Sequence, residues 1–303
     1  MSRTDAPRRD FNLSTTARAA RFARGFLLAL LALSSFATGG RDFACAQTNP
    51  RPPAQREIDT QQARLASTVM EERRDAVTRL GAMARPDAAR AAAAGLKDAA
   101  PIVRATAARA VLSLPAEEAA RLLLPLLDDK QEFVRRETAY ALGLTRSASA
   151  VEGLVMALAR DKEAGVRGAA AVALGQIGDA RAVPALSEAL GRRIRASGIL
   201  SRVTFRKTEE NEFVRRAAAI SLGQIRSREG VPALVAALSN ERVGDDVRRE
   251  AARALGEIGD ATASPALRAA LTARDPYLSE IAAESLRKLD PNNATRSAPK
   301  TSN

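Results

Sequence analysis

Apolar side chains recur along most of the chain at spacings of three and four residues, which places them on one face of a helix. The segments 183–190 and 231–238 show this spacing, and a second apolar helical segment precedes each of them. A glycine followed by aspartate, as at Gly178 and Gly259, separates helical segments. A proline such as Pro184 is tolerated in the first helical turn, where its missing N–H has no helical partner. The pattern predicts units made of a helix, a tight turn and a second helix.

These units recur with a nearly constant period along the sequence. Leucine stands twenty-three positions after a marker arginine in every copy; nineteen positions after it stands leucine, or alanine in the first copy, and seven positions after it an aliphatic residue. One helix pair cannot bury its apolar face, so the units must stack. The expected fold class is all-α, an α-solenoid (superhelix) of about six and a half repeats over residues 57–290. The marker arginines are Arg73, Arg104, Arg135, Arg167, Arg215 and Arg248.

The units resemble the HEAT repeat, in the short HEAT-like form first described in the phycobilin lyases. The lines GVRGAAAVALGQIGDARAVPALSEAL (165–190) and DVRREAARALGEIGDATASPALRAAL (246–271) carry the resemblance. It implies a solenoid, a fold that serves as scaffold, adaptor, inhibitor and occasionally enzyme. It also implies that each marker arginine pairs with an acid in a neighbouring inter-helix turn, here Asp179 and Asp260. The row of arginines is therefore expected to be structural.

One interval breaks the period, which predicts an insertion at about 191–210. Forty-eight positions separate Arg167 from Arg215, whereas the other markers follow one another after thirty-one to thirty-three positions. Insertions in repeat proteins map to loops on one face, often the binding face. Alternating residues around Ser197-Gly198 suit a β-hairpin; a flexible basic loop and a surface insertion without function are the alternatives.

The insertion is strongly basic, which makes it a candidate for binding. Its segment 192–207 has six basic side chains and no acid. If the insertion acts, Ile199 and Leu200 would add apolar contact. The side chains expected to contact a partner are Arg192, Arg193, Arg195, Arg202, Phe205, Arg206 and Lys207.

The second helices are expected to line the concave face of the solenoid. Variable positions on them, Glu188 and Arg268 among them, would then shape the contact with a partner. The prediction is a protein–protein interaction scaffold or adaptor that binds its partner on this face and through the basic insertion.

Missing residue types exclude several kinds of site. The chain has no His and no Trp, and its only cysteine is Cys45. A Ser-His-Asp triad, a Cys-His dyad and a zinc site of His or Cys ligands therefore cannot form. The paired carboxylates at 117–118 and 245–246 stand at predicted helix starts, where they favour the helix dipole. We expect no catalytic residues, no metal and no cofactor; the alternative is an enzyme of the lyase or isomerase type resembling the phycobilin lyases.

The formal net charge is +12, from 47 Lys+Arg against 35 Asp+Glu. Nucleic acid would match this charge, but the only tyrosines are Tyr140 and Tyr277, too few for a stacking platform. Outside the cytoplasm an acidic protein partner, a membrane surface or an anionic envelope polymer is favoured over nucleic acid, and the sequence does not choose among these three.

Residues 1–46 are expected to be a signal peptide. Six arginines precede the apolar run 26–38, which is too short to span a bilayer. Cleavage after Ala46 would leave an exported, periplasmic or secreted chain. Arg8-Arg9 leaves a twin-arginine route open, and membrane association would need an uncleaved leader or one lipidated at Cys45. Residues 47–56 are expected to form a linker, and 291–303 a disordered tail.

Overall fold

The structure is a computed structural model that describes residues 52–195 and 207–290. Contacts within the chain divide it into Met1–Asn49 and Pro50–Asn303, and all the described residues belong to the second unit. The predicted signal peptide and the C-terminal tail lie outside the described residues. The first helix, α1 (Pro53–Arg64), begins within the segment expected as a linker.

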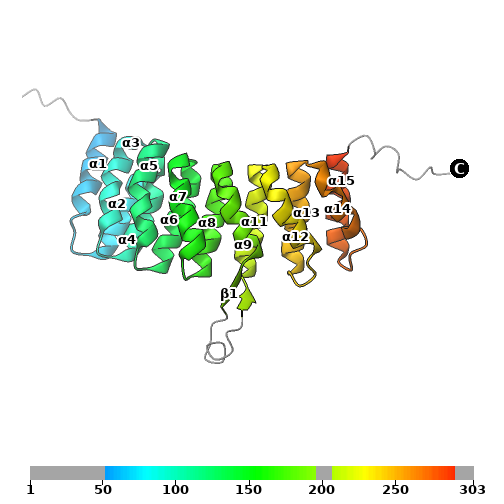
Figure 1. The fold of residues 1–303 in the computed structure, drawn as a ribbon. Coiled ribbons are helices and arrows are strands. Elements are labelled where there is room, and N and C mark those ends of the chain that lie inside the picture. The colour runs from blue at the N-terminus through cyan, green and yellow to red at the C-terminus, as the bar shows by residue number, and fades with distance from the viewer. Residues whose placement is uncertain (1–51, 196–206, 291–303) are drawn as a thin grey trace, which may run out of the picture. The chain divides into compact units, whose positions relative to one another are not determined.

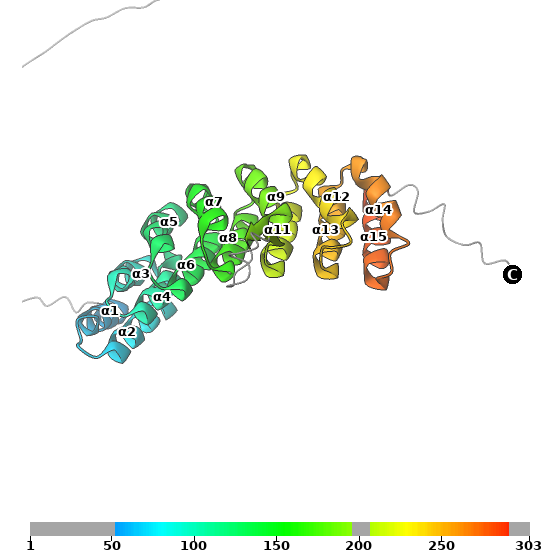
Figure 2. The same ribbon diagram turned by 60° about the horizontal axis from the view of Figure 1, so that its bottom comes forward.

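Over the described residues the helices alternate between two rows, which confirms the predicted all-α solenoid of six helix pairs and a half unit (Figures 1 and 2). The half unit is α15 (Pro276–Leu289). The first helices of the pairs are α2 (Met70–Ala82), α4 (Pro101–Ala110), α6 (Glu132–Thr145), α8 (Ala164–Ile177), α11 (Glu212–Ile225) and α13 (Asp245–Ile258). The second helices are α3 (Pro86–Ala92), α5 (Ala116–Leu123), α7 (Val151–Arg160), α9 (Val183–Gly191), α12 (Val231–Ser239) and α14 (Ser264–Ala270).

Short 3-10 turns complete the units. They extend the second helices of the first two pairs and α4, and they lead into the second helices of the other four pairs. The predicted prolines occupy the first turns of α9, α12 and α14. The turns are η1 (Ala93–Lys97), η2 (Val111–Ser113), η3 (Leu124–Asp128), η4 (Ala148–Ala150), η5 (Ala180–Ala182), η6 (Arg228–Gly230) and η7 (Ala261–Ala263).

In five of the six units the turn has a left-handed residue eleven positions after the marker arginine. Gly178 (φ 76°) and Gly259 (φ 74°) occupy it at the ends of α8 and α13, as the glycine signals predicted. Arg146 (φ 54°) and Arg226 (φ 56°) occupy the same place after α6 and α11. Ala84 (φ 50°) occupies it in the first unit. A residue with a β-carbon is strained there, so only two of these five turns have the favoured residue.

Neighbouring first helices pack closely through small residues. Glycines eight positions after the marker arginine let the next first helix approach, and a β-carbon at Gly143 would lie 2.7 Å from the Cα of Ala173 in α8. Gly175 meets Ser221 of α11 in the same way. This stripe explains why first helices lie side by side along the stack (Figure 1).

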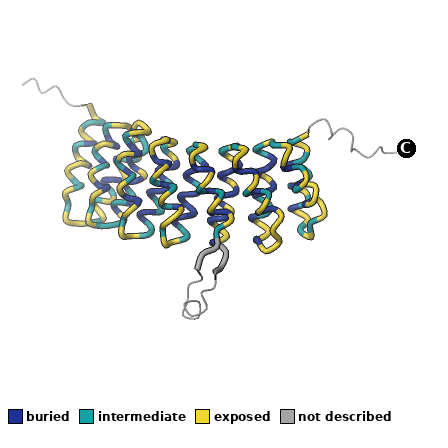
Figure 3. Tube along the Cα trace, viewed as in Figure 1, coloured by how far each residue is buried: buried dark blue, intermediate teal, exposed yellow. Residues whose placement is uncertain are grey.

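The core runs between the two rows of helices (Figure 3). The side chains seven, nineteen and twenty-three positions after the six marker arginines are all buried, with one exception. Leu271, in the last pair, is 41% exposed. The repeated apolar positions therefore form the core, and only the C-terminal end leaves one of them uncovered.

Candidate partner-binding surfaces

The marker arginines form a ladder of ion pairs inside the fold. Arg73 donates from Nε and Nη2 to both carboxylate oxygens of Asp98, at 2.7 and 2.8 Å. Its Nη1 donates to the backbone carbonyls of Ser67 and Thr68 in the preceding loop. The same arrangement repeats three times, so each guanidinium ties one inter-repeat loop to the next. The other pairs are Arg104 with Asp129, Arg135 with Asp161, and Arg167 with Glu210.

The structural role of these arginines is confirmed for four repeats, but the predicted partners were wrong. Asp179 and Asp260 accept hydrogen bonds from the backbone N–H groups of Arg181 and Thr262, at 2.9 Å each, and so cap η5 and η7. They stand inside a unit, whereas the marker arginine reaches the loop between units.

The ladder changes in the last two units. Arg215 donates from Nε to the carbonyl of Leu190 at 2.9 Å, and Arg248 to the carbonyl of Leu238 at 3.1 Å. The acid of the last loop, Asp275, pairs with Arg249 at 2.7 and 2.9 Å, one position further along α13. The bidentate pair is thus kept in the sixth unit by the neighbouring arginine.

These contacts shift the titration of the ladder carboxylates. Hydrogen bonds from the Arg73 guanidinium hold the pKa of Asp98 below its usual range, against an opposing effect of burial. For Asp129 and Asp161 burial raises the pKa, but hydrogen bonds from Arg104 and Arg135 and from backbone N–H groups outweigh it and leave the pKa lowered. Asp98, Asp129 and Asp161 are therefore ionised at neutral pH.

The insertion starts and ends at a buried cluster of three charged side chains. The Glu210 side chain has no exposed surface and accepts two hydrogen bonds from Arg167, at 2.6 and 3.0 Å. Arg192 lies 3.7 Å from the same carboxylate, and its Nη1 donates to the carbonyl of Leu158 at 3.3 Å. Arg192 therefore takes part in anchoring the insertion to the repeats, in addition to its predicted role in binding.

A short antiparallel pair of strands extends from the repeats at this cluster (Figure 1). Strand β1 (Arg193–Arg195) pairs with β2 (Lys207–Glu209), with Arg195 opposite Lys207. Where the strands join the repeats, the N–H of Glu210 donates to the carbonyl of Arg192 at 3.0 Å. The first strand is the predicted one, and the second strand follows the predicted segment 201–206. Arg202, Phe205 and Arg206 lie outside the described residues, as do Ile199 and Leu200.

The two predicted contact residues on the second helices lie apart. Glu188 is exposed on α9 and forms an ion pair with Arg192 at 3.2 Å. Arg268 is exposed on α14, and α12 stands between these two helices. Glu188 therefore adjoins the insertion, and Arg268 belongs to the C-terminal end of the stack.

The paired carboxylates serve the fold. Glu117 and Glu118 lie in the first turn of α5, as predicted. Glu117 accepts a hydrogen bond from the Ser147 hydroxyl at 2.7 Å, and Glu118 forms an ion pair with Arg90 at 2.9 Å. Among the described residues, no group of three or more His, Cys, Asp or Glu side chains could hold a metal ion.

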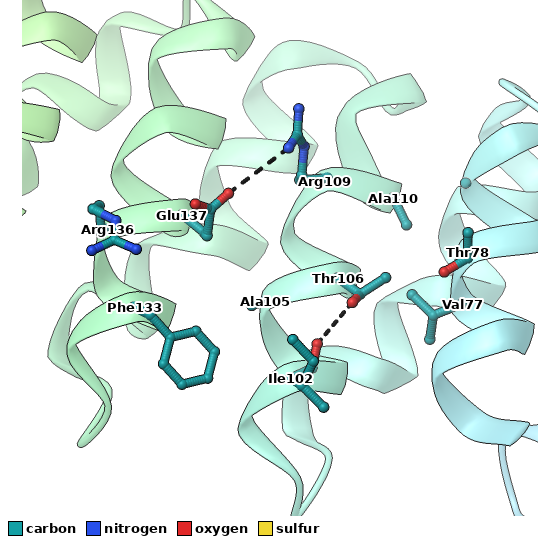
Figure 4. A pocket seen from close by; sticks show the side chains of 11 residues that line it. Val77, Thr78, Ile102, Ala105, Thr106, Arg109, Ala110, Phe133, Arg136 and Glu137 are labelled. Atoms are coloured by element: carbon teal, nitrogen blue, oxygen red, sulfur yellow. Dashed lines mark hydrogen bonds and ion pairs between the residues drawn. The ribbon is translucent and has the colours of Figure 1, made fainter. Parts of the chain in front are cut away.

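The first helices also form an apolar groove that the sequence did not predict (Figure 4). Val77 and Ala105 line it, Ile102 and Phe133 lie along it, and the Arg109–Glu137 ion pair, at 3.9 Å, stands at its edge. The signal was an apolar residue two positions before the marker arginine, where no further helix covers it. In the part of the chain that the structure describes, no helix has the length and apolarity to cross a membrane.

Comparisons with known proteins concern the fold. No curated protein sequence matches the chain. The solved structure of YibA from Escherichia coli is 22% identical, with a TM-score of 0.53, and the match covers 78% of this chain and 81% of that one. The complex of CpcE and CpcF of phycocyanin lyase from Nostoc sp. is 22% identical, covers 84% and 93%, and has a TM-score of 0.45. Human deoxyhypusine hydroxylase is 20% identical, covers 78% and 97%, and has a TM-score of 0.37.

A family model for HEAT repeats matches residues 62–143, 134–199 and 203–287, which together make up more than half of the chain. The matched segments take in all six helix pairs and most of the half unit. The chain belongs to the HEAT repeat family.

Proposed function

We propose that this protein is an exported, non-catalytic scaffold that binds an acidic protein partner through the basic insertion. The observation that carries the proposal is the anchored strand pair. A segment of six basic residues and no acid leaves the repeats and returns to them at the buried Arg167–Glu210–Arg192 cluster. A tolerated surface insertion needs no such anchor.

The ladder supports the same assignment. The marker arginines of the first four units use their guanidinium groups on carboxylates and carbonyls of the fold. The six basic residues of the segment 192–207 are separate from the marker arginines in the sequence. They are the group that can meet an acidic surface, where charge complementarity raises association rates and selects partners.

The test trims the insertion without breaking its anchor. Residues 196–206 are replaced by Asn-Gly, because Arg195 and Lys207 are paired and a two-residue turn joins paired antiparallel strands. The trimmed chain should keep its helical circular dichroism and melting temperature, since Arg192 and Glu210 stay in place. It should lose capture of the partner from an envelope extract.

A charge pair of variants makes the test specific. Arg202→Lys with Arg206→Lys keeps the charge and should keep capture, whereas Arg202→Glu with Arg206→Glu should abolish it. Recovery of the same proteins by the intact, trimmed and charge-reversed chains would show that the insertion binds nothing.

Export is tested on the full chain in a bacterial host. The expected product is in the envelope fraction and begins at Gln47, as measured by mass spectrometry of the intact protein. Full-length protein in the cytoplasm would contradict the export part of the proposal.

A further inference from the structure

Two repeated core positions lose their cover at the C-terminal end of the stack. Leu271 stands twenty-three positions after Arg248 and is 41% exposed, while its equivalents in the other five units are 1–8% exposed. In the half unit Ser279 stands where the other units have the marker arginine. Leu286 of α15 stands seven positions after it and is half-buried. Its six equivalents are fully buried.

The earlier units show what covers these positions. Gly153 of α7 lies against Leu127 of the preceding unit, so a second helix covers the position twenty-three of the unit before it. Gly230, the last residue of η6 before α12, lies against Leu222 of its own unit. The start of a second helix therefore covers the side chain seven positions after the marker arginine. The half unit α15 is the last helix among the described residues. Residues 291–303 contain no Leu, Ile, Val, Met or Phe.

The uncovered side chains line one groove between α14 and α15, which we call the C-terminal groove. Its small and apolar lining is Ala261, Ser264, Leu271, Ala283, Leu286 and Leu289, and the charged side chains of Glu280, Arg287 and Asp290 also line it.

Arg268 also lines the C-terminal groove, twenty positions after Arg248. The equivalent positions of the other units hold Ala93, Leu124, Val155, Ser187 and Val235, all uncharged. Arg268 forms no ion pair within residues 52–195 and 207–290. The residue twenty positions after the marker arginine is thus apolar or small in the first five pairs and basic in the last described pair.

We propose that the C-terminal groove binds one amphipathic helix of a protein partner, in the place of the second helix of a seventh repeat. The groove continues an interface that second helices fill in the preceding units, which defines the occupant. That helix carries two leucines four residues apart, as Leu234 and Leu238 are in α12, and an acidic residue facing Arg268. This site is independent of the basic insertion.

The first experiment uses a fluorescein-labelled peptide that copies Ser227–Asn240, the second helix of the fifth unit. Fluorescence anisotropy with the full chain should show saturable binding. Leu271→Glu should weaken it by roughly tenfold or more, because it places a charge where a leucine side chain docks. The control is Leu144→Glu, at another exposed leucine, on α6, which should leave binding unchanged. Both variants should keep the circular dichroism of the parent.

The second experiment tests the charge. Gly153 lies against Leu124, so the residue eighteen positions after a marker faces position twenty of the preceding unit. Ala233 is that residue in the peptide, and a peptide with Ala233→Glu should bind more tightly than the parent peptide. Arg268→Glu should remove the gain, and the Ala233→Lys peptide should restore it against that variant.

Three results would overturn the proposal. One is absence of binding by every peptide. Another is equal binding by the parent chain and Leu271→Glu, or by a peptide in which both leucines are alanine. The third is a dimer of the full chain that Leu271→Glu dissociates, which would assign the groove to a second copy. Trimming residues 196–206 should leave peptide binding unchanged, so failure here is separate from failure of the proposed function.

Discussion

Arg167 of α8 and Glu210, 43 residues later in the chain, form a bidentate ion pair with oxygen–nitrogen distances of 2.6 and 3.0 Å. In the two preceding units the partner acid follows after 25 or 26 residues. The insertion therefore ends at Glu210, the acid of the fourth ion pair of the ladder. The repeat register is kept across the insertion because Glu210 returns the chain to the position that an aspartate holds elsewhere.

Removing the buried carboxylate should destabilise the fold strongly. Glu210→Gln is expected to lower the free energy of unfolding by about 3–5 kcal/mol, because it leaves Arg167 buried without its counter-charge. The matched control is Glu118→Gln, whose partner Arg90 is half exposed and whose ion pair contributes about 0–1 kcal/mol. Urea unfolding followed by circular dichroism measures both. Equal losses for the two variants would contradict the role of the buried cluster.

Stability should fall in acid and stay level near neutrality. The pKa values of Asp98, Asp129 and Asp161 are lowered in the folded state. Their stabilisation is therefore full above the unfolded pKa of about 3.9 and is lost as pH falls through the folded values. The chain has no His, so little change is expected from about pH 8 to 5. Thermal melts across this range and down to about pH 3 measure it; a melting temperature that drops before about pH 5 would disagree.

Truncating the repeated leucines should cost stability according to burial. Leu190→Ala and Leu238→Ala should each lower the free energy of unfolding by about 2–5 kcal/mol, since both side chains are buried. Leu271→Ala, at the matching position of the last unit, should cost less because that residue is 41% exposed and loses less buried apolar area. Melting curves of the three variants measure these losses. Unchanged curves for Leu190→Ala and Leu238→Ala would show that these two leucines are not part of the core.

The left-handed turn residues offer stabilising substitutions. Arg226→Gly should raise the free energy of unfolding by about 1 kcal/mol, since glycine has no β-carbon to strain at φ 56°. Gly178→Ala, at the equivalent turn, should lower it by a similar amount. Chemical denaturation of the pair gives the answer, and the same sign for both changes would refute the backbone explanation.

The repeat period predicted the helix pairs, the core leucines and the positions of Pro184, Pro232 and Pro265, because each is a local consequence of residue spacing. The partners of the marker arginines were assigned incorrectly. An acid recurs 25 or 26 positions downstream of the marker, at Asp98, Asp129 and Asp161, and this regularity was visible in the sequence. The insertion shifted the next acid to Glu210 and hid it.

By itself the sequence determined the fold class and the register of the stack, since a period repeated six times specifies the same local structure each time. Tertiary structure alone decided which charges are buried together and which apolar positions stay uncovered. Both depend on neighbouring units: Glu210 is buried where Arg167 of α8 and Arg192, just after α9, converge on it, and Leu271 is exposed because no second helix follows α15 among the described residues.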